Sequence, residues 1–111
     1  MNRFKDKTVL VTGAAGLPHM VRAMALDADK DGVRVNAVNP SFTKTGMTED
    51  MLQKPELVAK FKERMPLGAP EDPEGVAAVM AFLASDDARL VTGVNLPVDA
   101  GVTASNGQPP M

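Results

Sequence analysis

Short apolar runs rich in β-branched residues alternate along the chain with stretches whose apolar residues recur every three or four positions. The first pattern is typical of buried strands and the second of helices with one apolar face. Strands are therefore predicted at residues 7–12, 33–38 and 92–98. Helices are predicted at 18–29, at 48–65 in two pieces (48–54 and 55–65, restarted at Pro55) and at 73–86. The order β-α-β-α-α-β predicts an α/β fold, a small three-stranded parallel sheet with right-handed crossovers and flanking helices.

Glycine and proline mark the ends of these elements. Asp31-Gly32 is a turn signal before the second strand, and Asp72-Pro73 is an N-cap followed by proline at the first helical position. Pro97 indicates that the last strand lies at an edge of the sheet. We expect one domain over residues 1–102, followed by a flexible polar tail at 103–111 that ends in prolines.

Composition excludes several classes of function. Twelve basic and fourteen acidic residues give a net charge of −2, which argues against nucleic acid or an anionic membrane as a partner. With no cysteine and the single histidine His19, neither a disulfide framework nor a Cys- or His-rich metal site is expected. No apolar segment approaches membrane-spanning length, so we expect a soluble cytoplasmic protein.

Three segments of the chain are similar to the short-chain dehydrogenase/reductase family. Residues 9–16 (VLVTGAAG) resemble the first strand and the opening of the family's TGxxxGxG cofactor loop. Residues 20–45 resemble the end of its catalytic helix, its sixth strand and the following PG-type loop, and residues 70–103, with VTGVNLPVDAG, resemble its last helix and strand. The resemblance implies a Rossmann-like sheet, NAD or NADP as cofactor, and alcohol or carbonyl substrates.

The centre of the family pattern is missing from this sequence. Leu17 and His19 stand where the second and third loop glycines would fall, and the family's catalytic lysine and tyrosine would align with Ala14 and Leu10. The matching segments run together at about Gly16-Leu17, which indicates an internally deleted fragment. Because the chain contains no tyrosine, the family's phenol is absent, and we expect the chain to be catalytically inactive.

The resemblance also implies which residues would meet a cofactor. A small-residue turn before a helix offers free N–H groups to a phosphate, although a strand-to-helix turn needs small residues for packing alone. The hydroxyl-rich loop after the second strand would meet the nicotinamide and pyrophosphate, or it merely caps the strand end. The candidate cofactor-binding residues are Gly13, Ala14, Gly16, Pro40, Ser41, Thr43 and Thr45. No catalytic residue and no metal ligand is predicted.

A second function of another class stays open, namely an oligomerisation or regulatory module without catalysis. In the family the last helix and strand commonly build subunit interfaces, and residues 72–98 match them, so self-association through 72–98 is expected. The apolar strand at residues 9–11 would also lose its family neighbours and form an unpaired edge. We interpret the following methionines as adaptable core filler: Met20, Met24, Met51, Met65 and Met80.

Overall fold

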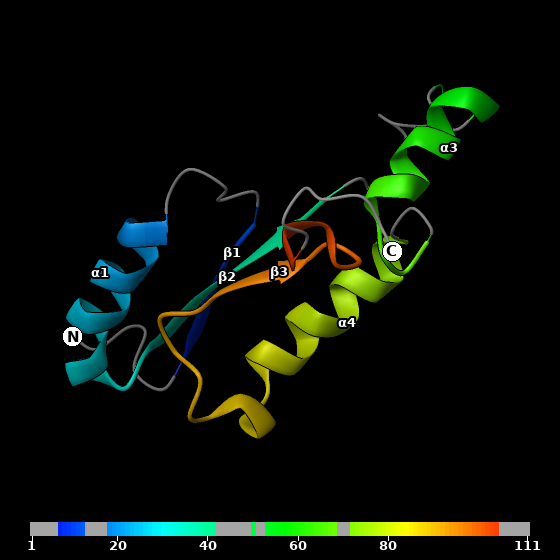
Figure 1. The fold of residues 1–111 in the computed structure, drawn as a ribbon. Helices are drawn as coiled ribbons and strands as arrows, with labels where there is room; N and C mark the ends of the chain where they lie inside the picture. Colours follow the sequence, from blue (N-terminus) through cyan, green and yellow to red (C-terminus); the bar gives the residue numbers. More distant parts are fainter. Residues whose placement is uncertain (1–6, 13–17, 42–49, 51–52, 69–71, 105–111) are drawn as a thin grey trace. The chain divides into compact units, whose positions relative to one another are not determined.

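The computed structural model describes residues 7–12, 18–41, 50, 53–68 and 72–104 (Figure 1). The chain divides into two compact units, one of residues 1–39 and 77–96 and one of residues 40–76 and 97–111. The elements in order are β1 (Thr8–Thr12), α1 (Pro18–Ala28), η1 (Asp29–Asp31), β2 (Arg34–Pro40), α3 (Pro55–Arg64), α4 (Pro73–Ala84), η2 (Asp86–Ala88), β3 (Asn95–Val98) and η3 (Val102–Ala104). The helix predicted at 48–54 lies largely outside the described residues.

A parallel pair of strands forms the centre of the first unit. β1 pairs with β2 in a register that runs from Thr8 opposite Arg34 to Thr12 opposite Val38. The strand order is β1-β2-β3, so β2 lies between two neighbours. Its residues from Val35 to Val38 are buried accordingly. An apolar run buried on both faces is what the sequence predicts for a parallel strand.

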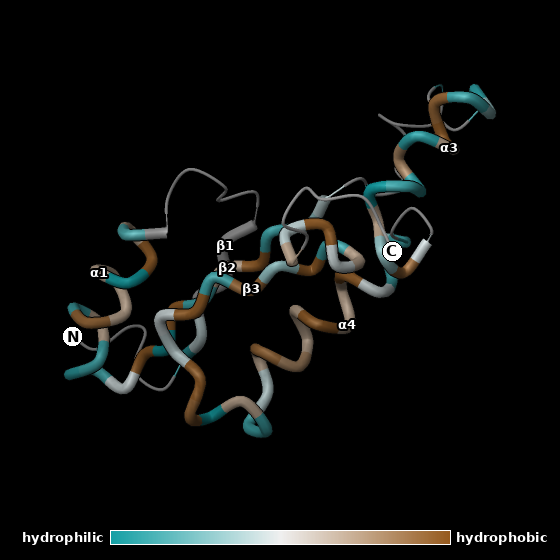
Figure 2. Tube along the Cα trace, in the orientation of Figure 1, coloured by the Kyte–Doolittle hydropathy of each residue, from teal (hydrophilic) through white to brown (hydrophobic). Residues whose placement is uncertain are grey.

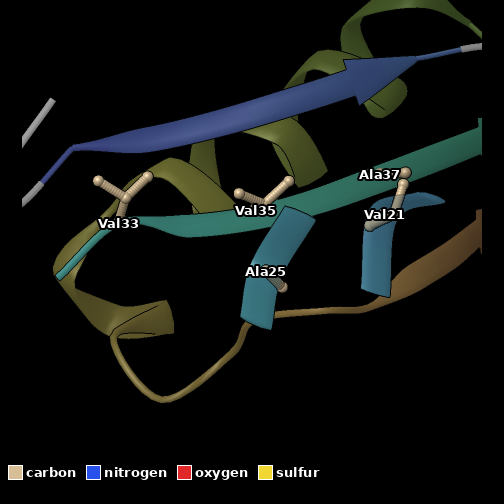
Figure 3. Close-up of a cluster of buried hydrophobic side chains, with 5 residues drawn as sticks. All are labelled: Val21, Ala25, Val33, Val35 and Ala37. Carbon is tan, nitrogen blue, oxygen red and sulfur yellow. The ribbon is translucent and has the colours of Figure 1, made fainter. Parts of the chain in front are cut away.

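The core of this unit forms where α1 packs against β2. Val21 and Ala25 of α1 come together with Val35 and Ala37 of β2 and with Val33, which precedes this strand (Figure 3). The helix was predicted correctly, but the face predicted from Met20 and Met24 was partly wrong, since these side chains are 45% and 37% exposed. The helix turns the smaller side chains of Val21 and Ala25 to the strand, and the longer methionines lie toward solvent.

The third predicted strand is shorter than expected and joins the sheet irregularly. Gly93 has a φ of 76°, so the strand begins at Asn95 instead of Thr92. The Gly93 N–H donates to the Val35 carbonyl and the Ala37 N–H donates to the Val94 carbonyl, both at 2.8 Å, so two residues face one on β2. The α/β class is confirmed. The regular three-stranded parallel ladder that was predicted is corrected to a two-stranded one with this irregular addition.

Helix α4 begins where the sequence predicts and ends two residues earlier. Asp72 caps it, because its carboxylate accepts a hydrogen bond from the Gly75 N–H. The helix ends at Ala84 because Ser85 has extended backbone angles, and the short η2 follows. Of the predicted apolar face, Leu83 is 1% exposed and Val76, Val79 and Met80 are half-buried.

In the second unit, α3 leads into a turn that meets the segment after β3. Met65 is 2% exposed, which confirms its place in a core, and the Leu67 N–H donates to the Ala100 carbonyl at 3.0 Å. Gly101 lies so close to Pro66 that a Cβ atom there would come within 2.9 Å of the proline ring. Thr103, which was predicted to start the tail, belongs to η3, and residues 105–111 lie outside the described part.

Candidate functional site: the carboxyl edge of the sheet

Both strands of the parallel pair end at the same edge of the sheet. Thr12 lies opposite Val38 at the end of the ladder, so the chain leaves β1 toward Gly13 where β2 continues to Asn39. In open α/β sheets the edge at the carboxyl ends of the strands is where ligands bind. The loop predicted after β1 therefore starts at the carboxyl edge of the sheet, where ligands bind in this kind of fold.

The structure places two of the seven candidate cofactor residues. Pro40 is the last residue of β2 and is half-buried, and Ser41 follows it and is exposed. The other five lie outside the described residues: Gly13, Ala14, Gly16, Thr43 and Thr45. Whether the two loops come together around a ligand therefore stays a prediction.

Asn39 is a polar residue at this edge that the sequence interpretation missed. Its Oδ1 atom is buried and accepts no hydrogen bond from the described residues. Asn39-Pro40 was interpreted as a turn signal, so the Asn39 side chain was not considered as a polar group inside the strand. A buried acceptor without a donor normally costs about 1–3 kcal/mol, so this atom stands out in the strand.

The start of α1 tests whether the edge fits a dinucleotide. The helix begins at Pro18, which has no N–H to donate, and His19 follows it with its side chain exposed. In the family pattern a glycine near this turn lets the backbone approach the pyrophosphate. A histidine side chain and a missing donor at the first helical turn do not fit that cradle, because the anion there is held by free N–H groups.

Arg34 hydrogen-bonds to four groups in other parts of the first unit, and it was also missed. Its Nη1 donates to the carbonyls of Leu83 at 2.8 Å and Val91 at 3.2 Å. Its Nη2 donates to the Thr8 hydroxyl at 2.9 Å and the Ser85 carbonyl at 3.1 Å. The cation thus lies at the end of α4, where free carbonyls and the helix dipole favour a positive charge. It ties that helix end to both strands.

Asn36 holds the segment before β3 in place. Its side chain is fully buried, with Nδ2 donating to the Val91 carbonyl at 2.9 Å and Oδ1 accepting from the Val94 N–H at 3.1 Å. Both ends of the amide are therefore satisfied by the backbone beside the irregular pairing at Gly93. The signal in the sequence was the alternation of Arg34 and Asn36 with valines in a predicted buried strand, because buried polar groups need partners.

Asp99 is the one buried acidic residue among the described residues. Its carboxylate accepts from the Gly101 N–H at 3.0 Å, the Thr103 N–H at 3.1 Å and the Thr103 hydroxyl at 2.7 Å. Burial raises the pKa of Asp99, but these hydrogen bonds favour the ionised form and together bring its pKa below the ordinary value. The carboxylate closes a turn, and these partners are two main-chain N–H groups and the hydroxyl of Thr103 in the same turn.

The described residues contain no other arrangement typical of catalysis. No group of three or more His, Cys, Asp or Glu side chains among them is placed to hold a metal ion. No helix in the described ranges is long and apolar enough to cross a membrane. An open hollow at the start of α3 contains none of the predicted site residues; it is lined by Gln53, Lys54, Pro55, Glu56, Leu57 and Lys60.

Comparison with known proteins relates most of the chain to one family. A family profile described as enoyl-(acyl carrier protein) reductase matches residues 4–103. The chain is 58% identical over 91 residues to meso-2,3-butanediol dehydrogenase of Serratia marcescens, and 38% identical over 96 residues to human (3R)-3-hydroxyacyl-CoA dehydrogenase. These matches cover 82% and 86% of the chain but 36% of each relative.

The fold is shared with solved structures of similar proteins. The crystal structure of gox2181 matches with a TM-score of 0.75 and 40% identity, over 82% of this chain and 35% of that one. A 4-hydroxyisoleucine dehydrogenase complexed with NADH matches in fold with a TM-score of 0.80 and 24% identity, over 89% of this chain and 47% of that one. The chain thus spans about a third to a half of the length of the proteins it matches.

Proposed function

This chain belongs to the short-chain dehydrogenase/reductase family, and because it covers 36% of the Serratia marcescens relative, we propose that it is an internally joined fragment of an NAD(P)-dependent oxidoreductase. The parent activity would be oxidation of a secondary alcohol or reduction of the matching carbonyl. The 58% identity to a meso-2,3-butanediol dehydrogenase favours a small vicinal diol as the substrate class. In its 111-residue form the chain does not carry out that reaction.

The absence of tyrosine from the sequence is the observation that carries this proposal. Oxidation of an alcohol moves a hydride to the nicotinamide and requires a group on the protein to take the hydroxyl proton. In the family that group is a phenol beside an ammonium, and the aligned positions hold Leu10 and Ala14. His19, the single histidine of the chain, is exposed in the first turn of α1 and has no hydrogen bond to another described side chain that would orient it as a base.

Weak cofactor binding at the carboxyl edge is the corresponding expectation. Pro18 and His19 do not fit the family's pyrophosphate cradle, so the loop after β1 would contribute little. A calorimetric titration with NADH and with NADPH tests this directly. We expect a Kd weaker than about 1 mM, which corresponds to roughly −4 kcal/mol, and micromolar binding would contradict the proposal.

A non-catalytic role in self-association is the second candidate, and α4 favours it. The helix is apolar along most of its length, as Figure 2 shows, and it exposes Phe82 to 48% together with Ala77, Ala78 and Ala81. A contiguous apolar surface of this kind normally meets a partner. Residues 72–98 would then bind a second copy or a longer family member, and Phe82→Glu would weaken that association.

Light scattering separates the two candidates when it is combined with the cofactor titration. The fragment proposal alone predicts weak NADH binding at every protein concentration. The second candidate predicts in addition a mass that rises with concentration and falls back to the monomer in Phe82→Glu. Because Phe82 is exposed, this substitution is expected to leave the far-ultraviolet circular dichroism of the monomer unchanged.

A further inference from the structure

Strand β1 lies at one end of the strand order, so among the described residues it has a strand neighbour on one side. Its five residues, Thr-Val-Leu-Val-Thr, include no charge, proline or glycine. Natural proteins usually protect an open edge with charged residues or proline, because an open edge pairs with other strands. The sequence of β1 also reads the same in both directions. If two copies of the strand pair about a two-fold axis, every residue therefore lies opposite a residue of the same type.

The ladder with β2 fixes which main-chain groups of β1 are left for a partner. The Arg34 N–H donates to the Lys7 carbonyl across the pair at 3.2 Å. Main-chain groups of successive residues in a strand alternate between its two edges, so Val9 and Val11 also bond to β2. The N–H and C=O groups of Thr8, Leu10 and Thr12 therefore point to the opposite edge. This edge offers donors and acceptors evenly along the strand.

We propose that two copies of the chain dimerise by antiparallel pairing of their β1 strands about a two-fold axis at Leu10. In this register Leu10 lies opposite Leu10 of the second copy, and Thr8 lies opposite Thr12. Each hydrogen-bonded pair exchanges two bonds, so the three pairs make about six. The pairing places Thr8 opposite Thr12 at both ends of the strand, and threonine–threonine pairs stabilise an antiparallel pair.

The second copy fits this edge better than an unrelated strand does, because the register meets no like charges. The five residues of β1 carry no charge, and in this register Lys7, which precedes the strand, does not lie opposite its own counterpart. A two-fold interface of this kind is self-complementary and closes at a dimer. The pairing would continue the sheet across two copies, and it uses a different surface from the apolar face of α4.

Cysteine cross-linking tests the register, because the chain has no native cysteine. Opposed residues of a hydrogen-bonded pair have Cα atoms about 5.5 Å apart, within the range of a disulfide. We expect Leu10→Cys to give a disulfide-linked dimer under mild oxidation, read by mass spectrometry of the full chain. Val9→Cys is the matched control, since its Cα atoms would lie roughly 7–8 Å apart on the diagonal and should cross-link about tenfold less.

A second pair of variants tests the proposal without changing Leu10. Thr8→Cys and Thr12→Cys are each expected to form no disulfide when oxidised alone, because in either variant the new cysteine lies opposite a threonine of the second copy. Mixed together they are expected to form the heterodimer. Equal cross-linking of every variant, or no mixed disulfide, would overturn the register. Cross-linking of Ala81→Cys on α4 with none at Leu10 or in the mixture would assign self-association to residues 72–98 and refute the β1 dimer.

Discussion

Replacing Arg34 by methionine removes all four hydrogen bonds of the guanidinium while keeping a long side chain in its place. The carbonyls of Leu83, Ser85 and Val91 would lose their shared donor. Hydrogen bonds to a charged group contribute roughly 1.5–3 kcal/mol each when well shielded. Arg34 is half-buried and its four bonds share one side chain. We therefore expect a loss of about 3–4 kcal/mol in the free energy of unfolding, well below the sum of separate bonds.

The matched control is Arg89→Met, which makes the same chemical change at an exposed position. Arg89 donates one hydrogen bond, to the Asp86 carbonyl at 3.2 Å within its own turn. Its replacement is expected to cost about 0.5 kcal/mol or less. Arg34→Lys keeps a positive charge near the end of α4 but loses the planar fork of the guanidinium. Its loss in the free energy of unfolding is therefore expected to lie between those of Arg34→Met and Arg89→Met.

Urea unfolding followed by circular dichroism measures these differences as shifts of the midpoint. A loss of 3 kcal/mol corresponds to a midpoint lower by about 1–3 M for m-values of 1–3 kcal/mol/M. For a domain of ordinary stability this is a large fraction of the total. If Arg34→Met loses no more than Arg89→Met, the guanidinium does not hold α4 to the strands and the reasoning from its contacts is wrong.

Two further predictions concern the turn after β3. Because the pKa of Asp99 lies below its ordinary value of 3.8, its ionised form stabilises the fold above that pH, and this contribution is lost as the pH falls through the folded pKa. Asp99→Asn should remove this part of the acid dependence of the melting temperature. An unchanged pH profile in this variant would contradict the prediction. Ala100 has a φ of 56°, so Ala100→Gly should stabilise the chain by about 0.5–1 kcal/mol. The control Ala81→Gly, in α4, should destabilise it by a similar amount. A loss of stability in both variants would show that glycine does not relieve the strain at Ala100.

The elements could be predicted from the sequence because their signals are local. Pro18, the Asp72-Pro73 cap and the Asp31-Gly32 turn each act within one helical turn, and the structure confirms them. The strand β3 was predicted too long because the positive φ of Gly93 depends on its pairing with β2. The exposure of Met20 has a similar cause, because the apolar spacing along the predicted helix does not determine which of its apolar residues contact the strand.

The polar contacts of the first unit could not be predicted because they join distant parts of the chain. Arg34 and Asn36 bond to groups 49 to 58 residues away, with the exception of Thr8. A polar residue inside an apolar strand signals that a partner exists, but not which one. For the candidate site, the sequence located the carboxyl edge through the end of β2, whereas the buried oxygen of Asn39 emerged from the structure.

The central claim is that the chain keeps the family's fold without its chemistry, and turnover tests this most directly. The purified 111-residue chain would be assayed for NADH or NADPH formation from meso-2,3-butanediol, with the full-length Serratia marcescens relative as the positive control. We predict no rate above the background of buffer and cofactor. A rate above that background which Gly13→Val abolishes would contradict the claim, because it would show that a chain without tyrosine supplies its own proton acceptor beside the nicotinamide.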